Sequence, residues 1–345
     1  MQQKVSVKDI AKELHISLST VHKALTGKPG VGEARRKEVL ETAKRMGYVV
    51  NGVAQSLARK DIRIGIIMPS KWQDYFAGMK IGMEEEIELL RKYKVEGLFY
   101  YLSTDFSDAE ADKAYRWIQE KKINVVIYCP SMYTVNEAFI KALQKTKLPV
   151  FLAGANTEKI DCISEICVDA ELSGRIAADF LHCTVPDKLR AIVFIGSKKV
   201  RPHMEKAQAF CARVRNHGGE VVHVFETQDE IEKTKDCNLK AEDMDYNAIY
   251  VATATSEPVC KYIDDNHLRD KVALLCTDLF DALKDYMKKN VVKATIYQNQ
   301  EQVGKKVVRA AYEYLVVKHS YGNDHVEIPD TISIRPNLYL LANIE

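Results

Sequence analysis

The first part of the chain shows a helical spacing of hydrophobic positions. In the stretch VSVKDIAKEL the apolar residues recur at i, i+3, i+4 and i+7, which predicts one helix face made of Val7, Ile10, Ala11 and Leu14. Ser6 and Asp9 have the spacing of a helix-starting capping box. A break at 15–17 separates this helix from a second one that ends near Leu25, and a third helix is expected over 33–46. Two short helices with a three-residue turn and a supporting third helix form a helix-turn-helix.

The second helix of a helix-turn-helix presents its N-terminal residues to base edges in the major groove of DNA. On this helix the positions that face away from the predicted core are Leu18, Ser19, His22 and Lys23. His and Lys can donate to guanine acceptors, and Leu can contact a thymine methyl group. Residues 1–60 hold 12 Lys and Arg against 5 Asp and Glu, whereas the remainder holds 38 against 43, so the basic end suits a polyanion. Taken alone, the segment could also be an ordinary solvated helix face.

The stretch VVNGVAQSLARK at 49–60 predicts a further short helix with apolar Val53, Ala54 and Leu57. A helix of this length is marginal by itself in water, because isolated helices need about 12–15 residues. Leu57 has no evident core to enter. The segment is therefore expected to fold on DNA and to insert an apolar wedge into the minor groove.

After Lys60 the pattern changes to short apolar runs separated by helical stretches. Such alternation is typical of parallel α/β sheets, and nine strands over 285 residues favour two lobes over one. The expected strands lie at 62–68, 95–102, 124–130, 149–154, 191–196, 220–226, 247–254, 272–278 and 293–299.

The blocks VSVKDIAKELHISLSTVHKAL, VGEARRKEVLETAKRMGY and NGVAQSLA, with their spacing, resemble the LacI/GalR family of bacterial transcriptional regulators. The resemblance implies a homodimer on a pseudopalindromic double-stranded DNA operator, with paired hinge helices in the minor groove. It assigns base reading to Leu18, Ser19, His22 and Lys23. It further assigns backbone contacts to Ser17, Thr20 and Asn51, and places Ala54 and the wedge Leu57 on the hinge helix. The sequence departs from the family at His22-Lys23, where Ser-Arg is usual, and at Gly32, Val50 and Gly52.

The resemblance also implies the organisation of the whole chain. We expect an all-α helix-turn-helix headpiece at 1–49 and a hinge helix at 50–60. An α/β two-lobed domain of the type I periplasmic-binding-protein-like fold, with parallel sheets, should occupy 61–345 and also mediate dimerisation. In that fold the chain crosses between the lobes three times, and the crossings are expected near 160–165, 298–301 and 324–330.

A ligand of such a domain should lie beyond the carboxyl ends of the strands, enclosed between the lobes. Sugars favour an aromatic face together with carboxylate, amide or guanidinium groups. The strand ends nominate Trp72, Tyr75, Phe76, Ser131, Ser197, Arg201, Thr253, Thr255, Asp278 and Gln298. The family usually has an Arg in the stretch EKAQAF, where this chain has Lys206. Either Arg201 takes over that role, or the ligand is not a typical hexose.

The motifs GxSxG, HExxH, GxxxxGK[ST] and GxGxxG are absent, and the eight cysteines and nine histidines have no zinc-ligand spacing. No catalytic activity, metal or cofactor is therefore expected. No secretory signal or membrane span is evident, so we expect a cytoplasmic protein. The sequence predicts a DNA-binding repressor controlled by a sugar-like effector. Control by a protein partner or by a non-sugar metabolite remains the alternative.

Overall fold

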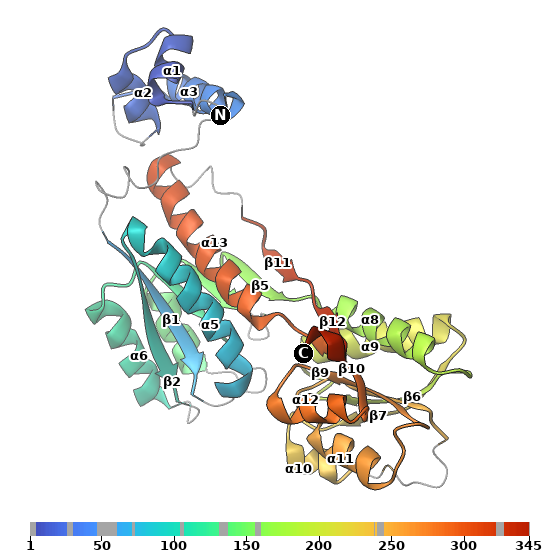
Figure 1. Cartoon of the computed structure of the whole chain (residues 1–345). Helices are drawn as coiled ribbons and strands as arrows, with labels where there is room; N and C mark the ends of the chain where they lie inside the picture. Colours follow the sequence, from blue (N-terminus) through green and yellow to red (C-terminus); the bar gives the residue numbers. More distant parts are fainter. Residues whose placement is uncertain are drawn as a thin grey trace.

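The computed structural model has three parts, a small helical unit and two α/β lobes (Figure 1). It describes residues 5–25, 30–46, 61–70, 73–103, 107–130, 137–155, 160–237, 239, 245–321 and 328–344. The expected hinge helix, with Asn51, Ala54 and Leu57, lies outside the described residues.

The helical unit consists of α1 (Val7–Glu13), α2 (Leu18–Leu25) and α3 (Glu33–Arg45). The three helices lie where the apolar spacing places them, and they bury Ile10, Val21 and Val39 against one another. The turn between α1 and α2 is made by His15, whose φ of 51° lies in the left-handed region. At the start of α1, Asp9 accepts a hydrogen bond from the Ser6 backbone at 2.8 Å, which completes the capping box.

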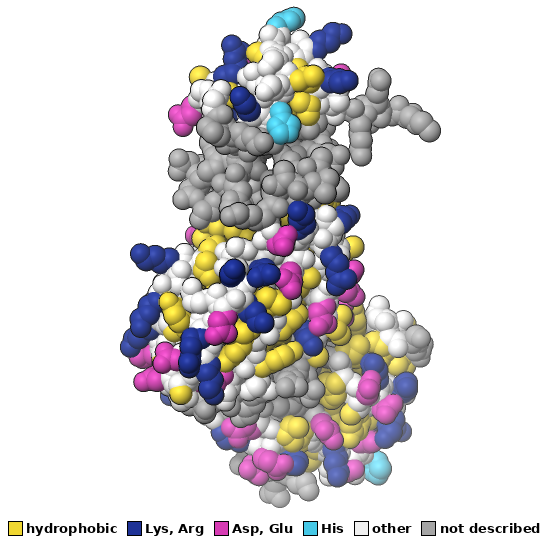
Figure 2. Space-filling view, turned by 90° about the vertical axis from the view of Figure 1, so that its left-hand side faces the viewer, with side chains coloured by type: hydrophobic (Ala, Val, Ile, Leu, Met, Phe, Trp, Pro, Cys, Tyr) yellow, Lys and Arg dark blue, Asp and Glu magenta, His cyan; other side chains and the backbone are white. Residues whose placement is uncertain are grey.

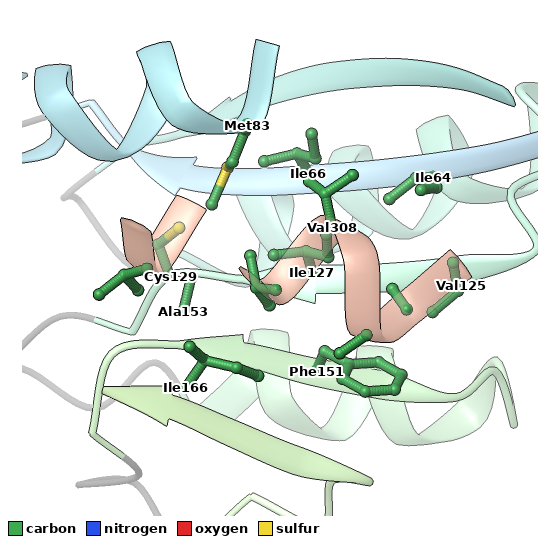
Figure 3. Close-up of a cluster of buried hydrophobic side chains, with 14 of the residues drawn as sticks. Ile64, Ile66, Met83, Val125, Ile127, Cys129, Phe151, Ala153, Ile166 and Val308 are labelled. Atoms are coloured by element: carbon green, nitrogen blue, oxygen red, sulfur yellow. The ribbon is translucent and has the colours of Figure 1, made fainter. Parts of the chain in front are cut away.

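Lobe 1 contains a fully parallel six-stranded sheet of order β11-β5-β4-β3-β1-β2. Helices α5 (Gln73–Leu90) and α13 (Gln300–Tyr321) cover one face, while α6 (Asp108–Glu120) and α7 (Glu137–Lys145) cover the other. Figure 3 shows how strand residues such as Ile66, Ile127 and Phe151 meet Met83 and Val308 in the core between the sheet and the first helix pair. The strands are β1 (Ile62–Pro69), β2 (Val95–Leu102), β3 (Val125–Tyr128), β4 (Val150–Ala153), β5 (Ser164–Val168) and β11 (Thr331–Ile334).

Lobe 2 has a second six-stranded sheet, of order β12-β10-β9-β8-β6-β7, in which only β12 runs antiparallel to its neighbour among the described strands. Helices α8 (Ala170–Thr184) and α9 (Arg201–Asn216) pack on one face. The other face carries α10 (Ile231–Lys235), α11 (Glu257–Asp265) and α12 (Asp281–Lys288). The strands are β6 (Arg190–Ile195), β7 (Glu220–Glu226), β8 (Ala248–Val251), β9 (Ala273–Thr277), β10 (Val292–Tyr297) and β12 (Asn337–Tyr339).

The chain crosses between the lobes three times (Figure 1), at 168–170, 297–300 and 334–337. The middle crossing agrees with the expected 298–301. The other two expectations, 160–165 and 324–330, are wrong, because each stops short of one more lobe 1 strand. Those strands, β5 and β11, pair with each other in register and are short and partly polar (SEICV and TISI), so their hydrophobic pattern is weak. All nine expected strands are present, and β5, β11 and β12 add to them.

The approach of α5 to α13 yields the first prediction. A Cβ atom on Gly82 would overlap the backbone carbonyl of Glu301, whereas one on Gly78, a turn earlier, would meet its nearest neighbour at 3.4 Å. Gly82→Ala should therefore lower the free energy of unfolding by about 1–3 kcal/mol. Gly78→Ala should leave it unchanged or raise it by up to about 1 kcal/mol through helix propensity. Urea denaturation checks this, and equal midpoints for the two variants would contradict such close packing.

Candidate functional site

A cavity of about 250 Å³ lies between the two lobes. Its walls are formed where strands end, with Pro130 after β3 and Gly154 after β4 on lobe 1, and Ala252 after β8 and Asp278 after β9 on lobe 2. This is the position at which open parallel sheets bind ligands. The wall of lobe 1 is mainly apolar and includes Phe76, Met79, Pro130, Ala153 and Val303.

Asp278 provides a buried carboxylate at the centre of the cavity wall. Its backbone φ of 67° is left-handed, a conformation that Asp tolerates better than most residues. Its carboxylate accepts hydrogen bonds from Gln298 Nε2 at 2.9 Å and from Gln300 Nε2 at 2.6 Å. Burial raises the pKa of Asp278, and the hydrogen bond from Gln298 and the charge of Lys206 oppose that rise. Two of its donors thus come from the crossing segment at 297–300.

Lys206 places a buried ammonium group opposite this carboxylate. It lies on the second turn of α9 and is only 4% exposed. Its Nζ donates to the Ala252 carbonyl at 3.0 Å and to Gln298 Oε1 at 3.3 Å. Burial lowers the pKa of Lys206, and the charges of Asp278 and Asp229 oppose that shift. The amide of Gln298 therefore bridges the cation and the anion, since it accepts from one and donates to the other.

His203 lines the same wall, three residues before Lys206 on α9. Its Nδ1 accepts the Ser197 backbone N–H at 3.1 Å. Burial, and then the charge of Lys206, lowers the pKa of His203 to about 3, so the ring is neutral and carries its proton on Nε2. Nε2 lies 3.7 Å from Asp229 Oδ2, and with a neutral ring this contact is polar rather than an ion pair.

Some of the predicted ligand residues line the cavity, some lie outside the described residues, and two lie near the cavity without lining it. Phe76, Thr253, Thr255, Asp278 and Gln298 line the cavity. Ser131 and Trp72 lie outside the described residues, as does the side chain of Tyr75.

Ser197 and Arg201 are not among the residues that line this cavity, and a contact of either with a ligand stays a prediction. The Ser197 hydroxyl accepts a hydrogen bond from the Lys199 backbone at 3.2 Å and so stabilises the loop before α9. The Arg201 guanidinium instead donates from Nη2 to both carboxylate oxygens of Glu165 in lobe 1, each at 2.9 Å. Lys206, at the position where Arg is usual in the family, supplies the cavity cation instead.

Several polar lining residues were missing from the predicted set, namely His203, Lys206, Asp229 and Gln300. The spacing of His203 and Lys206 at i, i+3 after Pro202 is the signal that could have found two of them, because it puts both on one face of a helix start. Asp229 follows β7, so a wider search of the strand ends would have included it.

Within the described ranges, no group of three or more His, Cys, Asp or Glu side chains is arranged to hold a metal ion. A separate search of the helices in the described part of the chain finds none long and apolar enough to cross a membrane.

The neutral state of His203 predicts a pH dependence of stability. Its folded pKa of about 3 lies below the ordinary 6.5, so the unfolded chain binds the additional proton between these values. The free energy of unfolding should therefore decrease as the pH is lowered from 6.5 towards 3, by up to about 1.4 kcal/mol per pH unit from this group. His203→Gln should make the slope between pH 6.5 and 4.5 shallower, whereas His223→Gln, at an exposed position of β7, should not. Equal slopes for wild type and His203→Gln would contradict a neutral buried ring.

Known proteins resemble this chain in sequence over part of its length. Catabolite control protein A of Priestia megaterium is 29% identical over 212 residues, which are 60% of each chain. The HTH-type transcriptional regulator pepR1 of Lactobacillus delbrueckii subsp. lactis is 30% identical over 193 residues, which are 56% of each chain. The chain thus matches less than two thirds of the length of these relatives, and neither name is that of an enzyme.

Solved structures resemble this chain in fold. An arabinose-binding protein from Geobacillus stearothermophilus superimposes with a TM-score of 0.69 at 16% identity, over 83% of this chain and 98% of that one. A protein assigned as a LacI transcriptional regulator from Bacteroides fragilis gives 0.65 at 14% identity, over 83% and 99%. The model of the periplasmic binding protein domain matches residues 64–319. Because this match spans more than half of the chain, the chain belongs to the periplasmic binding protein domain family.

Proposed function

We propose that this protein is a DNA-binding transcriptional repressor of the LacI/GalR type, acting in the cytoplasm, whose operator affinity depends on a small sugar-like effector bound between the lobes. The observation that carries the proposal is the cavity between the lobes, in which Gln298 bridges Lys206 and Asp278. The named relatives include a transcriptional regulator, and the structural neighbours include sugar-binding proteins.

The chemistry of the cavity suits a polyol. Carboxylate and amide oxygens accept hydrogen bonds from hydroxyl groups, while amide N–H, Lys206 and the threonine hydroxyls can donate to them. The apolar wall of Phe76, Met79 and Pro130 offers a surface for the C–H face of a ring. A cavity with a mainly apolar lining and a few convergent polar groups is the usual form of a small-molecule site.

We assign DNA binding to a headpiece at 1–49 with a hinge at 50–60, and effector binding to 61–345. On α2 the side opposite the buried Val21 exposes Leu18, Ser19, His22 and Lys23, and Leu18 is 48% exposed. Ser17 caps the helix by accepting the Thr20 N–H at 3.0 Å. A helix that begins with small hydroxyl residues allows close approach to phosphates, while the longer side chains reach bases.

We further propose that the protein is a homodimer, which matches a pseudopalindromic operator. On lobe 1, Ile81 and Leu89 of α5 and Tyr101 of β2 are 47%, 58% and 44% exposed, and β2 is an edge strand. Figure 2, which views the molecule from the side of α6 and β2, shows hydrophobic side chains grouped among charged ones on this lobe. A second copy would cover such an apolar face and its unpaired strand edge.

The cavity also provides a means of coupling. Gln300 belongs to α13 of lobe 1, Asp278 and Lys206 belong to lobe 2, and Gln298 lies in the crossing between them. A ligand that replaces or extends these contacts interacts with both lobes, so its affinity differs between lobe arrangements. Such a difference is what allows a ligand to shift an equilibrium, and the effect on DNA affinity must be reciprocal.

The DNA assignment predicts a steep dependence on salt. Operator affinity should fall with log salt by a slope of about −0.9 for each phosphate neutralised. Lys23→Ala should weaken binding to the cognate operator by about 1–3 kcal/mol and relax preference at one base pair. Fluorescence anisotropy with operator and random duplexes measures both. A slope near zero would contradict DNA binding, and an equal loss on both duplexes would make Lys23 a phosphate contact.

The effector assignment is tested with a panel of sugars and sugar derivatives. An effector should raise the melting temperature of the wild type, because a ligand of the folded state stabilises it. Asp278→Ala and the isosteric Asp278→Asn should lose this response and the effector's influence on operator affinity. Operator binding without effector should stay within about twofold of wild type, the change expected when a ligand contact far from DNA is removed.

Asp281→Ala serves as the control, since this neighbouring carboxylate is 98% exposed and lies outside the cavity lining. A normal effector response of both Asp278 variants would show that the cavity is not the effector site.

A further inference from the structure

Arg201 and Glu165 join the two lobes directly. Arg201 is the first residue of α9 in lobe 2, and Glu165 lies in β5 of lobe 1. The Arg201 Nη2 atom lies 2.9 Å from each oxygen of the Glu165 carboxylate. The Glu165 side chain is 10% exposed and that of Arg201 is 41% exposed. The carboxylate is therefore largely removed from water, and the guanidinium covers it from the side of the other lobe.

Each partner is oriented by its own lobe before the two meet. Thr331 of β11 is the register partner of Glu165 and donates its hydroxyl to Glu165 Oε1 at 3.2 Å. The Glu165 backbone N–H donates to the Asp330 carbonyl at 2.8 Å. On α9, Glu205 lies 3.6 Å from Arg201 Nη1, one turn further along the helix. Side chains that are already oriented lose less conformational entropy when they pair, so this ion pair stabilises more than a typical surface pair.

The position of the pair relates it to the movement of the lobes. Gln300, which donates a hydrogen bond to Asp278, stands at the end of a crossing segment. Its side chain can therefore move together with the chain that connects the lobes. Neither Arg201 nor Glu165 lies in a crossing segment. A rotation of the lobes about the crossings therefore moves the two residues relative to each other. Arg201 also begins the helix whose next residues, His203 and Lys206, form the cavity wall.

We propose that the Arg201–Glu165 pair is a clamp that holds the lobes in the present arrangement without any ligand. Rotation of lobe 2 breaks two charge-assisted hydrogen bonds and leaves the largely buried Glu165 carboxylate without its cation. The clamp thus positions α9 against lobe 1 and sets the proportion of molecules in this arrangement. Its action does not depend on the identity of the molecule that the cavity binds.

The experiment measures lobe separation in the full-length protein by single-molecule fluorescence resonance energy transfer. Dyes on genetically encoded keto side chains replace Lys113 of α6 and Asp285 of α12, which are 64% and 71% exposed and lie on different lobes. Arg201→Gln and Glu165→Gln should each lower the ratio of molecules in the present lobe arrangement to molecules with separated lobes by about tenfold. This is the order expected for loss of a charge-assisted pair. The double variant should be no worse than either single one, because the two residues act as a unit.

Arg213→Gln is the matched control. Arg213 lies on the same helix and also forms two hydrogen bonds to one carboxylate, from Nε at 2.6 Å and from Nη2 at 3.1 Å, but this carboxylate is that of Asp179 on α8 in the same lobe. The distribution of transfer efficiencies in Arg213→Gln should equal that of the wild type. Circular dichroism shows whether each variant folds, and Glu165→Gln leaves no buried charge unpaired if Arg201→Gln fails to fold. Unchanged distributions in Arg201→Gln or Glu165→Gln would overturn the clamp, as would an equal shift in Arg213→Gln.

Discussion

The arrangement between the lobes depends on how buried charge is compensated at the end of β9. Asp278 is held in a left-handed backbone conformation with its carboxylate removed from water. Such a group is unfavourable unless donors surround it. The donors are two glutamine amides from the crossing at 297–300, with Lys206 beyond one of them. Because these partners belong to two different segments, the crossing and α9, the folding of each lobe and the position of the crossing must agree for the carboxylate to be satisfied.

Helix α9 links this network to the rest of the molecule. Its first turns carry Arg201, His203 and Lys206, which reach lobe 1, the loop after β6 and the cavity respectively. Its later residues Phe210 and Val214 are fully buried in the core of lobe 2. A helix anchored in this way moves as one body with its lobe. Displacement of Lys206 therefore implies displacement of Arg201, so changes in the cavity and changes at the interlobe ion pair are mechanically connected.

Much of the fold follows from local patterns. The nine apolar runs and the helices between them were predictable, because each buries its own hydrophobic face. Asp278 and Gln298 were predictable as cavity residues, since each directly follows a strand. The two misplaced crossings have the opposite cause. Strands β5 and β11 are four or five residues long and partly polar, and they become strands only by pairing with each other and with β4.

The position of Arg201, whose side chain pairs with Glu165 outside the cavity lining, shows why site residues are harder to predict than strands. From the sequence, Arg201 and Lys206 are two cations five residues apart at the start of one helix. Which of them enters the cavity depends on Glu165, a residue of the other lobe that has no local signature. The same contact bears on regulation. Moving a two-state equilibrium from 1:99 to 99:1 needs a difference in affinity of about 10⁴-fold between the states. An interlobe ion pair that already favours one arrangement changes how large a difference in affinity the effector must supply. The strength of the Arg201–Glu165 pair and the affinity of the cavity for its ligand therefore act on the same equilibrium.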